Sequence, residues 1–385
     1  MHVLRKRRWA VGSLFFISGL YFSSWASRIP DFQKSFNLSE GQLGTLLLGL
    51  PTGSLIALPL AAWAVYKFGS KVVILLGITF YMLALILLGL AGSSIQLAFF
   101  VVGFGLMGNL MNISLNTQAI DIEDGYGRSI MNSFHGLWSL AGFTGAGVGA
   151  LMVYLGWDPF FHYLLVAAIG LIVVFIAASF LRPENQNSGQ SNQLVFKRPD
   201  PLLLRIGLVG FCGMLCEGCM FDWSGVFFSK VVQVAPTMVP LGFFAFMGAM
   251  ASGRFLADKI SNSLGKIAVL QISGAMISAG LIISTLFPNL WSAIFGFSLV
   301  GLGTASVIPL SYSIAGRSSN YPPSIAIAMV STLSFFGFLV GPPLIGFIAE
   351  IFNLKISFLL IAVMGSLIGL LVSIRQQVFA VGIKS

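Results

Sequence analysis

The feature that most constrains this 385-residue sequence is a series of apolar runs, each about 20 residues long and separated by short polar joints. An α-helix of about 20 apolar residues crosses the hydrocarbon core of a bilayer, which is about 30 Å thick. The runs lie at 9–29, 42–65, 72–92, 95–119, 131–155, 160–181, 202–228, 238–258, 265–286, 290–315, 325–350 and 355–374. The sequence therefore predicts an all-α membrane protein with twelve transmembrane helices.

Composition agrees with lipid as the main solvent. Hydrophobic residues make up 57% of the chain and charged residues only 9%, whereas soluble domains carry about 25% charged residues. This balance excludes a disordered chain, a secreted disulfide scaffold and a nucleic-acid-binding domain, and the lipid bilayer itself is an expected partner. The net charge of +9 then needs an explanation in terms of membrane orientation.

Basic residues predict that orientation, because the cytoplasmic loops of membrane proteins accumulate Lys and Arg. If the N-terminus lies inside, all but four of the 21 basic residues, Arg254 among them, fall in cytoplasmic segments. The outer side keeps only Arg28, Lys34, Lys230 and Lys355. We therefore expect a multi-pass protein of the bacterial cytoplasmic (inner) membrane with both termini in the cytoplasm. The first run is too long for a signal peptide, so it is expected to remain as a helix.

The chain also contains an internal repeat. Four matches recur in order at nearly constant offsets: Leu43-Gly44 with Leu241-Gly242, Trp25 with Trp223, Gly103-Phe104-x-Leu106-x-Gly108 with Gly296-Phe297-x-Leu299-x-Gly301, and Ser139-x-x-Gly142-Phe143 with Ser334-x-x-Gly337-Phe338. Between the halves lies a polar stretch that is typical of a flexible linker. We expect a six-helix bundle over 1–181, a cytoplasmic linker over 182–201 and a second six-helix bundle over 202–385.

Over nearly its whole length the sequence resembles the major facilitator superfamily, and within it the bacterial sugar-permease-like branch related to fucose permeases. The motifs that carry the resemblance are Trp25-Ala-Ser-Arg28-Ile-Pro30, His135-Gly-Leu-Trp138-Ser139, Glu217-Gly-Cys-Met-Phe-Asp222-Trp223, Gly253-Arg254-Phe-Leu-Ala-Asp258-Lys259 and Gly341-Pro342-Pro343-Leu-Ile-Gly346. The resemblance implies two pseudo-symmetric bundles of six helices and transport without enzymatic chemistry.

The family also has a Gly-x-x-x-Asp-Arg/Lys-x-Gly-Arg/Lys loop between helices 2 and 3, and a related loop between helices 8 and 9. The first copy here has Tyr66 where the acid would be. By resemblance, the candidate gate residues of both copies are Lys67, Gly69, Lys71, Arg254, Asp258 and Lys259.

Ionisable residues within predicted spans are candidates for function, because each costs about 3 kcal/mol or more in the bilayer. Glu217, near the middle of the run 202–228, is the first candidate for a proton carrier; the alternative is a structural acid bonded to a neighbouring helix. Asp222 is either a second such group or a structural acid paired with Arg28 or Lys230. His135 is expected near the cytoplasmic face, in a gate, in a proton exit or in a structural role.

Two rows of side chains are candidates for contact with a polar solute. Tyr21, Trp25 and Arg28 share one helix face, where they would bind a sugar. Alternatively, Trp25 is an anchor at the membrane interface and Arg28 extends its charged group to the water, as a snorkelling arginine does. The second row consists of three amides that can donate to and accept from hydroxyl groups, or join helices to one another: Asn109, Asn112 and Asn116.

No motif indicates a cofactor, ATP hydrolysis or a metal. Cys212, Cys216 and Cys219 share a helix face, but the outer two are about 10 Å apart along the axis and no His lies near them in the sequence. We expect a monomeric secondary transporter for a small polar solute such as a sugar, driven by protons. Efflux of drugs or metabolites by proton antiport, and a receptor that binds without transport, are the alternatives.

Overall fold

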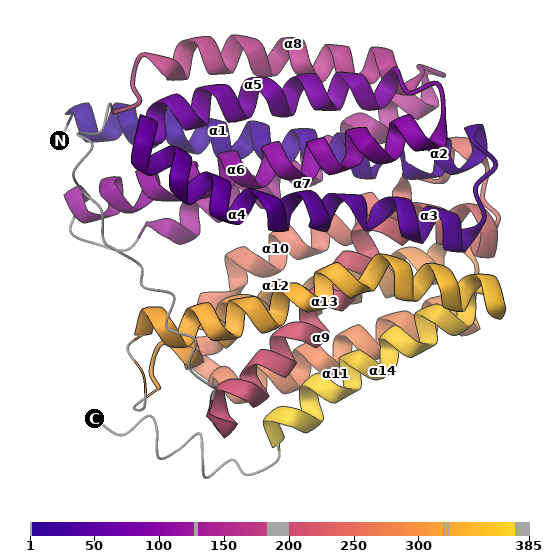
Figure 1. Cartoon of the computed structure of the whole chain (residues 1–385). Helices are drawn as coiled ribbons and strands as arrows, with labels where there is room; N and C mark the ends of the chain where they lie inside the picture. Colours follow the sequence, from indigo (N-terminus) through magenta and orange to yellow (C-terminus); the bar gives the residue numbers. More distant parts are fainter. Residues whose placement is uncertain (1, 127–129, 183–199, 319–320, 322, 374–385) are drawn as a thin grey trace. The chain divides into compact units, whose positions relative to one another are not determined.

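The computed structural model describes residues 2–126, 130–182, 200–318, 321 and 323–373. Within these ranges the regular structure is entirely helical, which confirms the predicted fold class (Figure 1). Apart from Arg182, Asp200 and Pro201, the predicted linker lies outside the described residues.

The helices follow the predicted runs closely. The first half contains α1 (His2–Ala26), α2 (Ile29–Ser35), α3 (Glu40–Leu47), α4 (Gly49–Phe68), α5 (Ser70–Gly89), α6 (Ser94–Tyr126), α7 (Met131–Tyr154) and α8 (Pro159–Ala178). The second half contains α9 (Pro201–Phe227), the π-helix η1 (Phe228–Val232), the 3₁₀ turn η2 (Pro236–Met238), α10 (Leu241–Leu264), α11 (Lys266–Leu286), α12 (Leu290–Ala315), α13 (Pro323–Ile351) and α14 (Leu354–Ser373).

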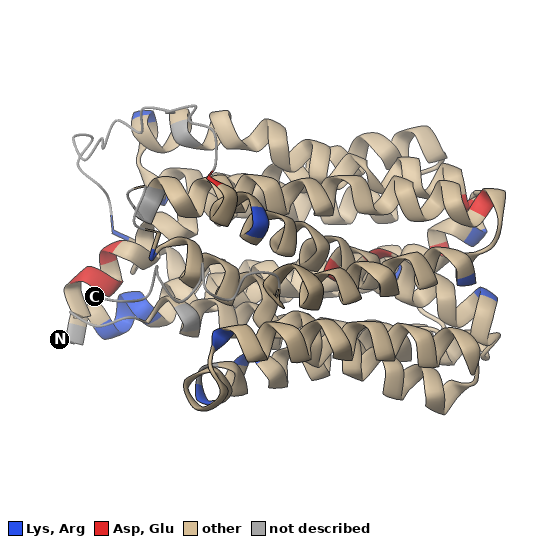
Figure 2. Cartoon of the chain, turned by 90° about the horizontal axis from the view of Figure 1, so that it is seen from below, with Lys and Arg blue, Asp and Glu red and all other residues tan. Residues whose placement is uncertain are grey.

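Eleven helical stretches of the described chain are long and apolar enough to cross a membrane, with α3 and α4 counted as one stretch. The helix α1, which corresponds to the predicted first span, is not among them because Ser, Gly and aromatic residues dilute its apolar run. Most of α1 beyond Trp9 is buried by protein, so its side chains do not need to dissolve in lipid. Figure 2 shows charged residues mainly at the ends of the helices.

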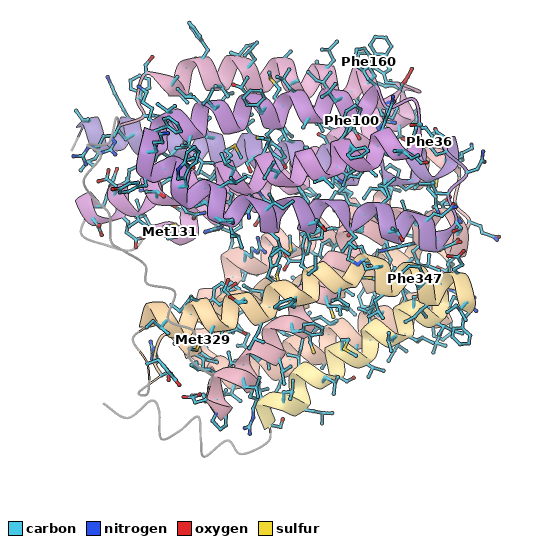
Figure 3. The ribbon with its side chains drawn as sticks, in the orientation of Figure 1. Phe36, Phe100, Met131, Phe160, Met329 and Phe347 are labelled. Carbon is cyan, nitrogen blue, oxygen red and sulfur yellow. The ribbon has the colours of Figure 1, made fainter. Side chains whose placement is uncertain are left out.

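The helices pack into two compact units. One comprises 1–38 and 45–191, and the other comprises 39–44 and 192–385. In the first unit Figure 3 labels Met131 and Phe160, the starts of α7 and α8, at opposite ends. In the second, Met329 and Phe347 mark opposite ends of α13. The long helices α7, α8 and α13 therefore begin or end at opposite ends of their units.

Equivalent turns and contacts recur in the two units, but at an offset of 196 residues, so Gly301 corresponds to Gly105 and not to Gly108 as the sequence match predicted. Gly69 and Gly265 separate α4 from α5 and α10 from α11, and their φ angles are +78° and +83°. Such positive φ angles are easily reached only by glycine. A Cβ atom on Gly105 would lie 2.0 Å from the carbonyl oxygen of Leu50, and one on Gly301 would lie 2.3 Å from that of Phe246. All these pairs are related by one constant offset, so each half folds in the same way.

Two helices extend beyond their predicted ends. The acidic segment after Ala119 was expected to be a loop, but α6 continues through it to Tyr126. The carboxylate of Glu123 accepts hydrogen bonds from the backbone N–H groups of Ile130 and Met131, at 2.6 and 2.7 Å, and so caps the start of α7. The helix α10 continues to Leu264 instead of ending at 258.

Candidate functional site

The strongest candidate site in the second unit is an ion pair between α9 and α10. Glu217 is only 6% exposed and lies about 24 Å along α9 from Pro201. Nη2 of Arg254 donates to Oε1 of Glu217 at 3.2 Å. Arg254, which the charge distribution assigned to a cytoplasmic segment, lies within α10, about 15 Å before the helix end at Leu264.

Polar groups from two further helices adjoin this pair. Tyr312 on α12 is close enough to Glu217 to interact with it electrostatically. The hydroxyl of Tyr312 donates to Oγ of Ser331 on α13, at 3.1 Å, or accepts from it. Neither residue stands out in the sequence, because single hydroxyl groups are common in membrane helices. A carboxylate, a guanidinium and two hydroxyls from four helices can bind a proton and a polar ligand.

Asp222, one turn and a half beyond Glu217, has a different environment. Its side chain is 7% exposed, and no hydrogen-bond or ion-pair partner is present among the residues described. The two partners expected for it are occupied elsewhere, since Arg28 pairs with Asp31 in the first unit and Lys230 pairs with Glu40. That expectation was wrong. A buried carboxyl group without a cation is costly to keep ionised.

In the first unit, Arg28 joins the end of α1 to the start of α8. It is 3% exposed and donates through Nε to Nδ1 of His162 at 3.2 Å, through Nη1 to Asp31 at 2.8 Å, and through Nη2 to the carbonyl of Trp157 at 2.7 Å. All three nitrogens therefore have protein partners. This geometry fits neither a snorkelling arginine nor one that is open to a solute.

Tyr21 and Trp25 lie in an aromatic core instead of on an open face. Tyr21 is fully buried with its ring 5.7 Å from that of Tyr81, and Trp25 is 1% exposed with its ring 5.3 Å from that of Phe32. Nevertheless, the hydroxyl of Tyr21 and Nε1 of Trp25 have no hydrogen-bond partner in the described part of the chain. The same holds for three more buried atoms on α1 and α8: Oγ of Ser24, Nε2 of His162 and the hydroxyl of Tyr163.

The three asparagines of α6 are half-buried and do not act as one row. Nδ2 of Asn109 donates to the carbonyl of Ser54 on α4, at 2.7 Å. Nδ2 of Asn116 donates to the carbonyl of Asn112 at 2.8 Å and to its Oδ1 at 3.2 Å. These bonds leave Oδ1 of Asn109 and Nδ2 of Asn112 with no partner among the described residues. The asparagines therefore both join helices and keep polar atoms open.

The remaining candidates lie near helix ends. His135 is exposed in the second turn of α7, with its ring centroid 5.6 Å from that of Phe15. The ammonium of Lys67 lies over the rings of Trp63 and Phe68, at 5.1 and 5.4 Å from their centroids. Lys71 is half-buried at the start of α5, and Lys259 is exposed on α10. The side chain of Asp258 lies outside the described residues.

Comparison with known proteins now decides the family. A profile of the family described as Major Facilitator Superfamily matches residues 11–325. The chain belongs to the Major Facilitator Superfamily. An uncharacterized transporter of this superfamily from Yersinia pestis is 34% identical over 348 residues, which cover 89% of each chain. The membrane protein MosC of Rhizobium meliloti is 30% identical and matches 93% of this chain and 88% of its own length.

Solved structures agree on the fold of this superfamily member. A bacterial homologue of the human lysosomal transporter Spinster, inward-facing and unoccupied, has a TM-score of 0.74 at 15% identity and covers 100% of this chain and 98% of its own. The nucleoside transporter NupG has a TM-score of 0.75 at 12% identity, with both chains fully covered. The protein is therefore a multi-pass membrane transporter of the superfamily and not an enzyme.

Proposed function

We propose that this transporter moves a small polar solute by alternating access and couples the movement to protons. The ion pair of Glu217 and Arg254 is the observation that supports coupling most directly. A carboxylate attracts the guanidinium across the α9–α10 contact, and a protonated carboxyl group loses most of that attraction. Proton binding therefore changes the free energy of one helix contact, which is what a coupled conformational change requires.

The first unit supports a polar solute. Tyr21 and Trp25 hold buried polar atoms without partners, and Asn109 and Asn112 keep amide atoms open. Hydroxyl groups of a sugar can accept from an indole N–H and from an amide N–H, and can donate to an amide oxygen. Because the sequence resembles sugar permeases, monosaccharides are the first solutes to test. Nucleosides follow, because a nucleoside transporter shares the fold.

Reconstituted vesicles test the proposal. With a pH gradient imposed, we expect labelled solute to accumulate, with sugars, sugar acids, amino acids, nucleosides and cationic drugs as the panel. Glu217→Gln should abolish the accumulation and leave exchange of labelled for unlabelled solute measurable, because the amide cannot release a proton. Glu350→Gln removes an exposed acid of the same unit and serves as the matched control. Undiminished accumulation by Glu217→Gln would rule out this residue as the carrier.

We further propose that both termini are cytoplasmic, that the protein lies in the bacterial inner membrane, and that the transporting unit is a monomer. The distribution of basic residues supports the orientation. In the same vesicles, efflux by antiport would appear as solute movement opposite to the proton flow, whereas symport moves the solute with the protons.

A further inference from the structure

The turn between α4 and α5 carries candidate gate residues whose side chains the proposed proton coupling does not use. Lys67 and Lys71 flank Gly69, and neither ammonium has a hydrogen-bond or ion-pair partner among the described residues. The family's loop has an acid at the position that Tyr66 occupies here. Within the described part of the chain, two positive charges therefore have no negative partner at the end of a membrane helix.

Exposed aromatic rings surround these charges. The exposed fractions are 54% for Trp63, 69% for Tyr66 and 47% for Phe68, and Lys67 lies over two of the three rings. Trp and Tyr are enriched where a membrane helix passes from hydrocarbon to headgroups, because their rings are both apolar and polar. Lys67 therefore lies at the level where lipid phosphates are found.

An apolar stripe leads from the hydrocarbon to Lys67. On α4 it consists of Ile56, Leu60 and Trp63, spaced so that they share one helix face with Lys67, and all three are at least 41% exposed. On α5 exposed apolar side chains also recur at every third or fourth position, but the first of them comes five residues after Lys71, so they lie on a different helix face from it: Leu76, Phe80, Leu83 and Leu87. The helix α4 therefore offers surface for an acyl chain directly below the ammonium group of Lys67.

The corresponding turn of the second unit is built differently. There Gly265 occupies the position of Gly69, and the neighbouring Lys266 donates to Oγ of Ser313 at 2.6 Å. The ammonium group of that loop is therefore bound by protein. Among the described residues of the two turns, the turn at Gly69 has two ammonium groups without a protein partner, whereas Lys266 beside Gly265 has one.

We propose that Lys67 and Lys71 form a binding site for the phosphate of an anionic phospholipid, with the aromatic rings of the turn at the headgroup level and an acyl chain along α4. Each lysine close to an anionic membrane surface contributes about 1 kcal/mol, so two should favour an anionic over a zwitterionic lipid by about 30-fold. The ligand belongs to the bilayer and not to the transported solutes.

The test uses the full-length protein, delipidated in detergent and titrated with phosphatidylglycerol or phosphatidylcholine. Native mass spectrometry counts the bound lipids. We expect the wild type to retain phosphatidylglycerol at least tenfold more strongly than phosphatidylcholine. The double variant Lys67→Gln/Lys71→Gln should lose this preference, and Lys67→Arg/Lys71→Arg should keep it, which separates loss of charge from loss of fold.

The matched control removes two exposed lysines elsewhere. Lys34→Gln/Lys355→Gln lowers the net charge by the same amount and should leave the preference unchanged. If the control loses the preference as much as the Gln variant at the turn, net charge alone explains binding and the site does not exist. Equal retention of both lipids by the wild type would also overturn the proposal.

Discussion

At the scale of single residues, the contact of Glu217 with Arg254 places two opposite charges where water is scarce. Removing one member of such a pair leaves the other without compensation, whereas removing both can be nearly neutral. The measured stability of single and double variants therefore reports whether the two charges depend on each other. Arg254 is 21% exposed at its side chain, so its charge is partly hydrated even in the pair.

We expect Arg254→Leu to lower the free energy of unfolding by about 3 kcal/mol, because it leaves the carboxylate of Glu217 buried and unpaired. The double variant Glu217→Leu/Arg254→Leu should recover most of this loss. Thermal unfolding in detergent measures both. If the stability losses of Glu217→Leu and Arg254→Leu instead add up to the loss of the double variant, the two charges do not interact in the folded protein.

Arg28 gives a second prediction for a single residue. In Arg28→Lys one ammonium replaces a planar group that reaches His162, Asp31 and the carbonyl of Trp157. The unmet bonds should cost about 1 to 3 kcal/mol of stability, measured by thermal unfolding. Arg317→Lys, at an exposed position, is the control and should melt like the wild type. A fall in solute affinity with unchanged melting would instead show that Arg28 contacts the solute.

Single residues also show where sequence reasoning reached its limit. Glu217 could be chosen from the sequence because an acid in an apolar run is costly. Its partner could not, because Arg254 lies close to a basic segment and the end of α10 has no proline to mark it. Tyr312 and Ser331 were missed for a related reason: their position beside Glu217 depends on how four helices pack, which no local pattern records.

At the scale of helices, the contact of α6 with α4 depends on the absence of one side chain. We expect Gly105→Ala to destabilise the protein by about 1 to 3 kcal/mol, because its Cβ would lie 2.0 Å from the carbonyl oxygen of Leu50. Gly103→Ala is a matched control two residues away, since nothing lies within 4 Å of its Cβ. The control should raise the free energy of unfolding by about 0.5 to 1 kcal/mol, because alanine leaves the unfolded chain less conformational entropy than glycine does.

Thermal unfolding of both glycine variants in one detergent measures the difference. Equal melting temperatures would mean that α6 can move away from α4 without cost. Gly301→Ala repeats the experiment at the equivalent contact in the second unit and should behave like Gly105→Ala.

The ends of helices were harder to predict than their middles. The apolar runs identified each long helix because lipid requires them. The end of α6 was misjudged because acidic residues are typical of loops, whereas here Glu123 remains helical and caps α7 through two backbone N–H groups. The break between α3 and α4 at Leu48 also lies inside an unbroken apolar run, so hydropathy alone could not reveal it.

At the scale of the whole molecule, orientation in the membrane is open to direct measurement. The three native cysteines are buried in α9, so they give little background in labelling with a membrane-impermeant maleimide. In intact cells we expect the maleimide to label Lys34→Cys and Lys355→Cys, which the proposed orientation places outside. It should label Lys67→Cys and Lys259→Cys, on the cytoplasmic side, only after the membrane is opened. The reverse pattern would place both termini outside and contradict the proposed orientation.

The length of α6 has a practical consequence. Its 33 residues extend about 50 Å, roughly 20 Å more than the hydrocarbon core is thick. Near the C-terminal end of α6, Asp121 forms ion pairs with Arg7 and Arg182. These pairs connect α6 to the start of α1 and to the end of α8. Microscopists who image small membrane proteins need a stiff feature outside the micelle, and this ion-paired end of the first unit is a suitable epitope for an antibody fragment.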